Sequence, residues 1–412
     1  MQTEIVYISR DFENFHTTQI SIRHLAYWLE DLGLSTPIRT QIIENETSLV
    51  NYLDSAIKRS FLTIIINDPN ISKSNNIRRI IAKIFKRNLV LNDNILTKIN
   101  KNYEQSSLDI PSSIQTDALL PRGSIMLKDE TGTPVGFIIE EDGKFAISLP
   151  SSLKKIKYIF KKAIAPLLLK KAGMVKKNTR LFYVRTCGLG EDEIKERIVP
   201  IFNQNKSSYY LIAHEHGVDV GITTPWDEQD SNLKELLIDK LGLSIYSFDI
   251  TKQIEKIISE LFEDRDIDLA VAESCTGGLI GHRITQVPNS SKYFKYSVVA
   301  YSNLAKQRIL GISSIKLKQY GAVSAEIAEE MAYKVKQISG TTIGLSVTGI
   351  AGPGGETADK PVGLVFCGLS TTIKTISQSF YFKGDRGSIK LQASQMALNM
   401  LREFLILGKK WK

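Results

Sequence analysis

The stretch that decides the fold is residues 267–285, IDLAVAESCTGGLIGHRIT. Its apolar first half predicts a buried strand, and Gly277 and Gly278 predict a turn that opens a helix. Catalytic groups favour the carboxyl ends of strands in open α/β sheets, which makes Ser274 a candidate nucleophile. The backbone N–H groups of Thr276, Gly277 and Gly278 are candidates for binding a phosphate or a developing oxyanion.

Other interpretations of this turn stay open from the residues alone. Ser274 or Thr276 could be the N-cap of the helix, a role that the spacing slightly favours. Cys275 is a rival nucleophile, although a thiolate needs a basic partner and a cysteine at a helix start is more often a packing residue. The GxSxG signature of common esterases is absent from this region.

A serine nucleophile needs a base. Of the five histidines only His282 falls in this region, inside the predicted helix, so a Ser-His-Asp triad has little support. Lysine is the alternative base when desolvation lowers its pKa. Lys306 lies five residues after Tyr301 at the start of another predicted helix, where both could meet Ser274. Most lysines are solvated, so the spacing alone makes this a weak signal.

Two further strand ends carry candidate site residues. The segment 346–355, SVTGIAGPGG, ends a strand and contains Gly349, Gly352 and two more glycines, a pattern that permits close backbone approach to a ligand. Gly384, Asp385 and Arg386 open the last predicted helix. An arginine there can bind a phosphate or carboxylate in a fork, and a surface ion pair is an equally good interpretation.

The bulk composition bounds the class of protein. A chain of 412 residues suggests about two to four domains, and 42% apolar with 24% charged residues argues against wholesale disorder. The three cysteines are far apart, which favours a reducing cytoplasm over a disulfide framework or a thiolate zinc site. The N-terminus does not read as a signal peptide, and no apolar stretch approaches the roughly 20 residues that cross a bilayer. We therefore expect a cytoplasmic protein with no membrane association.

The net charge of +9 has a local origin. Residues 153–177 contain nine lysines and no acid, which alone accounts for the excess. A solvated helix face running into a linker is the favoured interpretation, and a nucleic-acid or membrane-surface patch is the alternative.

The order of predicted elements indicates an α/β protein of three domains. Strand and helix signals alternate over residues 1–172, which is typical of a largely parallel sheet. The order β-α-β-β over residues 178–250 predicts a small α+β module. Residues 251–408 again alternate strands and helices, and they contain all the candidate site residues above.

Five blocks of this last region resemble the C-terminal domain of the CinA family (competence/damage-inducible protein A). They occur in the family's order and at its approximate spacing, and they are AESCTGGLIGHRIT (272–285), VAYSNLAKQRILG (299–311), YGAVSAE (320–326), VTGIAGPGGETADKPVGLV (347–365) and FKGDRGSIKLQAS (382–394). The resemblance implies a nicotinamide-nucleotide amidase. Such an enzyme converts nicotinamide mononucleotide and water into nicotinate mononucleotide and ammonia.

The same resemblance implies roles for individual residues. Ser274 would be the nucleophile, Lys306 its base, and Tyr301 an orienting group in the same network. Thr348 would support the hydroxyl network or the oxyanion. The substrate side would comprise Thr276, Gly277, Gly278, Ser290, Ser291, Gly349, Gly352 and Arg386, with Arg386 holding the phosphate. No metal or cofactor is expected for this domain, because a serine acyl intermediate supplies the covalent route.

The rest of the chain resembles the full-length family with departures. Residues 178–250 look like its KH-like middle domain, and residues 1–172 look like its molybdopterin-binding-like domain, which is linked to Mg-dependent ADP-ribose cleavage. Here SRDFE (9–13), NDPNISKS (67–74) and LPSSL (149–153) replace the family's glycine- and acid-bearing motifs, and Asp68 alone does not make a magnesium site. The departures predict a lost pyrophosphatase and a domain that now serves assembly.

The expected partners follow from these resemblances. We expect a small-molecule nucleotide substrate and a homodimer. Nucleic acid is not expected, because the GXXG loop that KH domains use is not evident. A non-catalytic partner or scaffold protein in competence or DNA repair is the alternative function, and the decayed N-terminal motifs are the reason to consider it.

Overall fold

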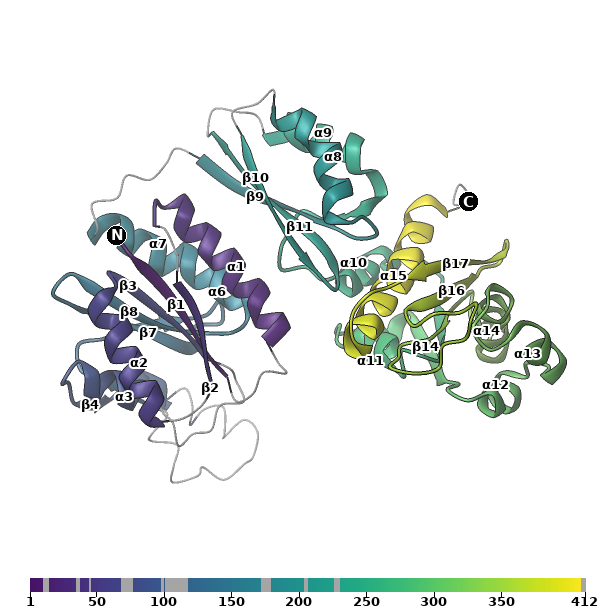
Figure 1. Ribbon diagram of the computed structural model, residues 1–412, viewed down its shortest axis with the longest axis horizontal. Coiled ribbons are helices and arrows are strands. Elements are labelled where there is room, and N and C mark those ends of the chain that lie inside the picture. The colour runs from purple at the N-terminus through teal and green to yellow at the C-terminus, as the bar shows by residue number, and fades with distance from the viewer. Residues whose placement is uncertain are drawn as a thin grey trace. The chain divides into compact units, whose positions relative to one another are not determined.

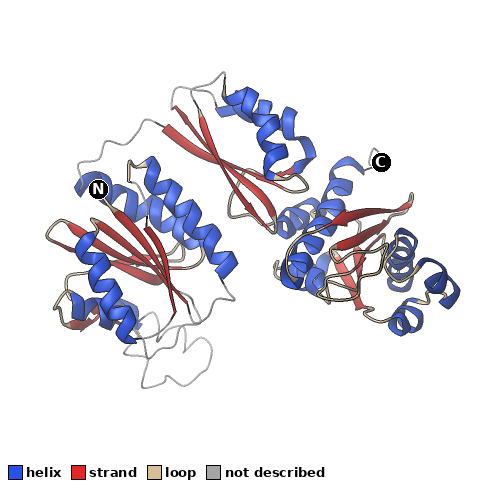
Figure 2. Ribbon diagram, in the orientation of Figure 1, coloured by secondary structure: helices blue, strands red, loops and turns tan. Residues whose placement is uncertain are grey.

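The computed structural model describes residues 1–9, 15–34, 38–43, 46–67, 77–97, 100, 118–171, 179–203, 207–225 and 230–408. The chain divides into two compact units, Met1–Asn178 and Thr179–Lys412 (Figure 1). Each unit mixes helices with β-sheet (Figure 2), so the expected α/β class is confirmed. The three-domain division and the likeness of residues 178–250 to a KH domain stay predictions.

The first unit is built on a six-stranded sheet with helices on both faces. In sheet order the strands are β2 (Ile38–Ile43), β1 (Thr3–Ser9), β3 (Leu62–Asn67), β8 (Lys144–Pro150), β7 (Pro134–Glu141) and β6 (Ile125–Lys128). The first four run parallel, β7 pairs antiparallel with β8, and β6 pairs antiparallel with β7. The largely parallel sheet expected from the continuous apolar runs is therefore confirmed. Strands β1 and β3 are apolar throughout because both of their faces are buried.

Helices cover this sheet in two groups. They are α1 (Phe15–Asp31), α2 (Glu46–Arg59), α3 (Ile77–Ile84), α6 (Leu153–Ile159), the π-helical turn η1 (Phe160–Ile164) and α7 (Ala165–Lys171). A small two-stranded sheet pairs β4 (Leu89–Leu91) with β5 (Leu119–Pro121). One face packs against α2 and α3, and α1 contacts α6 on the other (Figure 1). The predicted helix end at Gly33 is confirmed by its left-handed backbone, φ +84°.

The lysine-rich segment is helical over its described part, residues 153–171. Lys154 pairs with Glu130, Lys155 lies 3.2 Å from Asp129, and Lys171 lies 3.1 Å from Glu140. Neighbouring strands and turns thus supply the acids that this segment lacks. The solvated helix face favoured by the sequence fits this part of the segment, and residues 172–177 lie outside the described residues.

The second unit contains two sheets, of which the first is antiparallel. Its order is β10 (Ser208–His214), β11 (Gly217–Pro225), β9 (Thr179–Thr186) and β12 (Ile245–Ser247), and α8 (Glu191–Phe202) and α9 (Asp230–Leu241) pack on it. The predicted β-α-β-β order is confirmed. The sequence-based reading missed α9, the short turn η2 (Gly242–Ser244) and β12, which complete the module.

The second sheet of this unit has five strands. Their order is β14 (Phe294–Val299), β13 (Leu269–Glu273), β15 (Ile343–Gly349), β16 (Leu364–Ser370) and β17 (Thr375–Tyr381). The first three run parallel, and β16 and β17 are antiparallel additions. The carboxyl ends of β13, β14 and β15 therefore meet at one edge, where the candidate nucleophile was expected.

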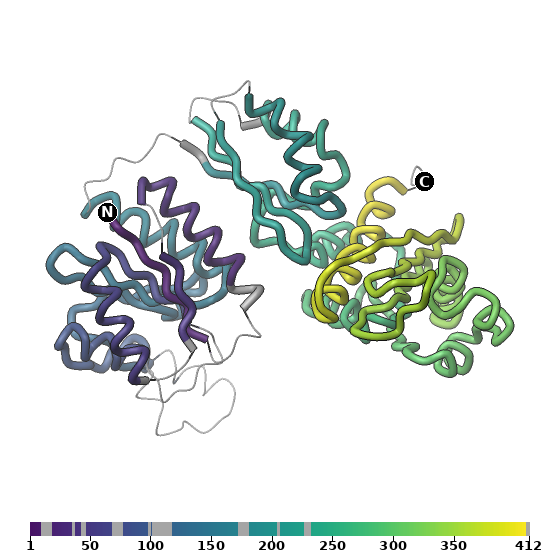
Figure 3. The backbone as a smooth tube through the Cα atoms, in the orientation of Figure 1, coloured from purple at the N-terminus to yellow at the C-terminus, as the bar shows by residue number. Residues whose placement is uncertain are grey.

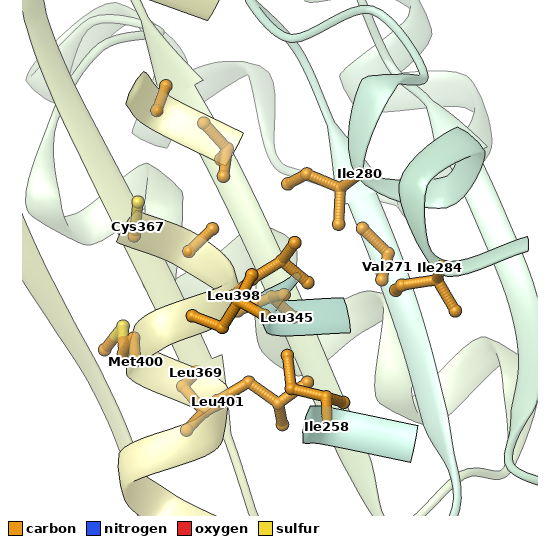
Figure 4. Packing of buried hydrophobic residues seen from close by; sticks show 14 of the residues in the cluster. Ile258, Val271, Ile280, Ile284, Leu345, Cys367, Leu369, Leu398, Met400 and Leu401 are labelled. Carbon is orange, nitrogen blue, oxygen red and sulfur yellow. The ribbon is translucent and has the colours of Figure 1, made fainter. Parts of the chain in front are cut away.

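Helices form a layer on each face of the five-stranded sheet. One face packs against α10 (Ile254–Phe262), α11 (Leu279–Thr285) and α15 (Arg386–Leu407), and the other against α12 (Asn303–Leu310), α13 (Ser314–Tyr320) and α14 (Ala325–Ser339). Figure 4 shows side chains of the first layer, among them Ile258, Ile280 and Leu398, meeting strand residues such as Val271 and Leu345. The yellow tube of Figure 3 traces α15, which contacts β15 and β16.

Among the described residues, no helix is long and apolar enough to cross a membrane.

Candidate active site

Ser274 is the first residue after β13. Its N–H donates to the carbonyl of Val347 on β15 at 2.9 Å, so the strand pairing continues up to the serine itself. The chain then turns at Gly277, φ +62°, and Gly278, φ +95°, in the left-handed region that glycine adopts without strain. The turn leaves Ser274 at the carboxyl edge of the sheet and 7% exposed.

Glu273, which the sequence-based reading did not single out, caps the helix that follows. Its buried carboxylate accepts the N–H groups of Gly278 at 3.0 Å, Ile280 at 3.1 Å and Gly281 at 2.9 Å. The N-cap interpretation of Ser274 and Thr276 is therefore wrong, because neither hydroxyl caps α11. An acid directly before a glycine turn at a strand end was the available signal.

The same contacts decide which backbone N–H groups of the turn remain free to bind a ligand. Gly277 N–H donates to the carbonyl of Ser274 at 3.1 Å, and Gly278 N–H is bound by Glu273. The expectation that both glycine N–H groups are free is wrong. Within the described part of the chain, the N–H of Thr276 has only the thiol of Cys275, a weak acceptor, as a partner, and the Thr276 hydroxyl is buried without a hydrogen bond.

Lys306 contacts Ser274 from α12, which packs on the opposite face of the sheet from α11. The hydroxyl of Ser302 accepts the N–H of Ala305 at 3.0 Å and caps α12, and Lys306 lies in the first turn of that helix. Its Nζ donates to Ser274 Oγ at 2.9 Å and to the Ala300 carbonyl at 3.0 Å. The side chain is 1% exposed. The two residues that the sequence placed in one network are therefore in direct contact.

The environment of Lys306 suits a base. No carboxylate forms an ion pair with it in the described part of the chain, and burial lowers its pKa to about 8. A charged ammonium loses hydration when it is buried, and hydroxyl and carbonyl oxygens replace that hydration only in part. The neutral amine is therefore accessible near physiological pH.

Cys275, the rival nucleophile, faces the hydrophobic core. It is 6% exposed and packs in the cluster beneath α11 and α15. Burial raises the pKa of its thiol to about 12. Because the thiolate is the reactive form, this cysteine stays unreactive at neutral pH.

Tyr301 and Arg386 meet at the rim of the site. Arg386 Nη2 donates to the Tyr301 hydroxyl at 2.7 Å, and Nη1 donates to the carbonyl of Gly352. Asp385 caps α15 by accepting the N–H of Ser388 at 2.8 Å, which fixes the first turn that carries Arg386. Tyr301 is 58% exposed, and its carbonyl lies 3.5 Å from Lys306 Nζ. These contacts join α12, α15 and the glycine-rich loop.

Thr348 and the two predicted loop glycines serve internal packing. The Thr348 hydroxyl donates to the carbonyl of Ala322 at 2.7 Å, which ties β15 to the segment before α14. A Cβ at Gly349 would lie 2.6 Å from Val365, and one at Gly352 would lie 2.8 Å from Val362. The chain's own side chains thus occupy the space beside both glycines.

Ser290 and Ser291 lie away from Ser274, contrary to the sequence-based grouping. They belong to the 3-10 turn η3 (Ser290–Lys292) before β14, and Tyr293 in the same segment accepts the N–H of Leu269, the first residue of β13. The five residues of β13 separate this end of the sheet from Ser274, a span of about 16 Å. The resemblance grouped these serines with the site, but the parallel strand order puts them at the opposite edge.

Metal ligands are not gathered in the described part of the chain, since it holds no group of three or more His, Cys, Asp or Glu placed to bind a metal ion. In the first unit, the described carboxyl ends of β1 and β3 are Ser9 and Asn67. Asn67 Nδ2 donates to Ser148 on the adjacent strand at 2.9 Å. Neither of these two residues carries a carboxylate, the ligand that magnesium prefers. Asp68, most of the replaced loop motifs and their structure lie outside the described residues.

Known proteins resemble both the last region and the whole chain. The family model of the CinA C-terminal domain matches residues 251–405. A protein of Caldicellulosiruptor saccharolyticus, named among the competence-damage inducible proteins, is 34% identical over 417 residues and covers 98% of this chain and 100% of the relative. The CinA-like protein of Kosmotoga olearia is 33% identical over 413 residues, 98% of this chain and 99% of the relative.

A solved structure is similar to part of the chain. The crystal structure of the competence/damage inducible protein CihA from Agrobacterium tumefaciens is 37% identical, covers 36% of this chain and 90% of that chain, and has a TM-score of 0.35. The full-length relatives carry the assignment. This chain belongs to the CinA family of competence-damage inducible proteins.

Proposed function

We propose that Ser274 and Lys306 are the catalytic pair of an amidohydrolase whose substrate is nicotinamide mononucleotide. The observation that supports this proposal is the 2.9 Å contact between Lys306 Nζ and Ser274 Oγ, made by a buried lysine whose pKa is lowered to about 8. A serine activated by an adjacent base is the usual arrangement of a covalent acyl-transfer site. The nucleotide follows from the family resemblance of the surrounding motifs.

The reaction proceeds in two halves. Neutral Lys306 takes the hydroxyl proton as Ser274 Oγ attacks the carboxamide carbon, which gives a tetrahedral intermediate. The C–N bond then breaks, Lys306 returns its proton to the leaving nitrogen, and ammonia departs from a nicotinoyl ester on Ser274. Water attacks this ester with Lys306 again as the base, and release of nicotinate mononucleotide restores the Ser274 hydroxyl.

The oxyanion needs donors beside the nucleophile. The backbone N–H of Thr276 is suited to this role, because Glu273 and Ser274 already engage the N–H groups of the two glycines that follow. A purely structural role for the site would leave the burial of Lys306 without a compensating carboxylate unexplained, since burying an unpaired charge is costly. This argument favours an enzyme over a non-catalytic scaffold.

The test is ammonia release from nicotinamide mononucleotide by the full chain, with a parallel sample in EDTA. We expect release that survives EDTA and that falls by at least about 10³-fold in Ser274→Ala. A matched control is Ser313→Ala, which changes an exposed serine that caps α13. No release by the wild-type chain from the nucleotide, its riboside or free nicotinamide would overturn the proposal.

For the first unit we propose assembly without magnesium-dependent hydrolysis. The segments at 9–13, 67–74 and 149–153, which replace the family's glycine- and acid-bearing motifs, support this, because magnesium is bound mainly through carboxylates and phosphates. ADP-ribose hydrolysis assayed with added magnesium is the test. We expect none, and EDTA-sensitive hydrolysis would contradict the proposal.

A further inference from the structure

Arg386, the residue to which the family resemblance assigns the phosphate, already donates to groups of the protein itself. One guanidinium nitrogen donates to the Tyr301 hydroxyl and another to the Gly352 carbonyl. These bonds fix the first turn of α15 to the residues just before α12 and to the glycine-rich loop. Binding a phosphate through the same two nitrogens would release both partners, so Arg386 is better suited to hold the rim of the site together.

Lys390 lies one helical turn after Arg386 on α15, and residues at this spacing share a helix face. Its Nζ is 3.8 Å from the position that a Cβ on Gly277 would occupy. No other described atom comes within 4 Å of that position, apart from the glycine's chain neighbours. The ammonium therefore lies beside the turn that follows Ser274.

This ammonium has unused hydrogen-bonding capacity. Lys390 is half-buried, and it makes no hydrogen bond or ion pair with any described residue. Carboxylates on the neighbouring segments have other partners, since Glu273 accepts three N–H groups, Asp385 accepts the N–H of Ser388, and Glu215 accepts the Ser388 hydroxyl. A cation without a carboxylate partner is available for an anionic ligand.

Thr276 supplies a second, independent observation. It adjoins Gly277, it is 0% exposed, and its hydroxyl has no hydrogen-bond partner among the described residues. Buried hydroxyls are nearly always satisfied, so an orphaned one at a candidate site points to a missing ligand or water. Gly277 is three residues from Ser274, a chain length that spans at most about 10 Å. The orphaned hydroxyl and the ammonium thus lie near the nucleophile, displaced from it along the turn.

We propose that Lys390, assisted by Thr276, binds the phosphate monoester of the substrate and makes the site select a nucleotide over its dephosphorylated riboside. This inference rests on the proposed amidase function. Ser274 engages the amide, and Lys390 engages the anionic group at the other end of the same molecule. Arg386 positions Tyr301 and the loop, and it does not carry the phosphate.

The experiment compares nicotinamide mononucleotide with nicotinamide riboside as substrates of the full chain. Losing a charge-assisted hydrogen bond to phosphate in Lys390→Gln should lower kcat/KM for the nucleotide about 10- to 100-fold, mainly through KM. We expect kcat/KM for the riboside to stay nearly unchanged. Lys390→Arg should retain most of the preference, because the charge remains.

Lys383→Gln is the matched control, because it removes the same charge from an exposed position seven residues earlier on the chain. Its ratio of nucleotide to riboside activity should equal that of the wild type. An equal loss on both substrates in Lys390→Gln, or no loss on either, would overturn the inference.

A binding measurement separates this inference from the proposed reaction. Ser274→Ala protein is titrated calorimetrically with each compound, with and without Lys390→Gln. We expect the nucleotide to bind more tightly than the riboside, and this difference to disappear when Lys390 is replaced. If the wild type hydrolyses neither compound but the binding difference behaves in this way, the amidase proposal fails and phosphate recognition stands. If the binding difference is absent or survives Lys390→Gln, phosphate recognition by Lys390 fails.

Discussion

Two of the cations that the second unit buries, Arg185 and Lys306, have contrasting partners. In the antiparallel sheet, Arg185 donates to Asp219 at 2.8 Å and to the carbonyl of Lys252 at 2.8 Å, and it lies over the ring of Tyr246. At the edge of the five-stranded sheet, the partners of Lys306 among the described residues are a hydroxyl and carbonyl oxygens. Arg185 is neutralised by a carboxylate and serves the structure, whereas Lys306 is left poised to lose its proton. The pairing state separates a structural cation from a candidate base.

The largest expected effect is the loss of activity when Lys306, the cation without a carboxylate partner, is replaced. Lys306→Met should lower kcat for amide hydrolysis by about 10²- to 10⁴-fold, because no other base contacts Ser274 in the described residues. Steady-state ammonia release measures it, with circular dichroism to check folding. Retention of more than about a tenth of the activity would show that another group takes the serine proton.

At the paired cation the expected effect is on stability. Asp219→Ala should cost about 3–5 kcal/mol of unfolding free energy, because it leaves the buried Arg185 without its carboxylate. Urea denaturation measures the change. The control Asp239→Ala alters an exposed acid, whose side chain is 70% exposed, and should stay within about 0.5 kcal/mol. Equal effects of the two substitutions would contradict the structural role of Asp219.

Removing the unpaired cation should stabilise the fold. Burial lowers the pKa of Lys306 from 10.5 to about 8, so below about pH 8 the native state holds a disfavoured charge. Lys306→Met should therefore raise stability at pH 7 by up to about 3 kcal/mol. Between about pH 8 and 10.5 the unfolded chain binds more protons than the native one, so wild-type stability rises with pH and this gain shrinks.

The pH dependence is measured by urea denaturation at pH 7 and above 10.5, with the exposed Lys318→Met as control. A gain in Lys306→Met that is the same at both pH values would show that the lysine carries no burial penalty. A loss of stability at pH 7 would show that its hydrogen bonds outweigh that penalty.

The smallest expected effect is at the neighbouring thiol. Cys275→Ala should change kcat/KM by less than about threefold, because the thiol faces the core and its raised pKa keeps it protonated. Labelling with a thiol reagent at neutral pH should likewise leave activity intact. Inactivation by either treatment would restore Cys275 as the nucleophile.

The sequence located the elements that carry the candidate site better than it located side-chain partners. Strand ends and helix starts follow from local apolar runs and glycines, which is why Ser274 and Lys306 were placed at the correct edge. The capping role of Glu273 and the contact of Arg386 with Gly352 depend on how turns fold back in space. Local patterning does not encode such partners.

Two further misses have physical causes. Ser290 and Ser291 were grouped with Ser274 by motif, and only the parallel pairing of β13 with β14 shows that they precede the strand at its far end. The sequence also did not predict the short elements β12 and α13, because they contain too few residues for a periodic signal. Short elements of this kind are stabilised by the sheets and helices that they join.

The most direct test of the central claim is the pH dependence of kcat/KM for nicotinamide mononucleotide. The free lysine must be neutral to accept the serine proton, so kcat/KM should rise with pH and reach a plateau above about pH 8. A plateau that sets in near the ordinary histidine pKa of about 6.5, or a profile that is flat from about pH 6 to 9, would contradict Lys306 as the base.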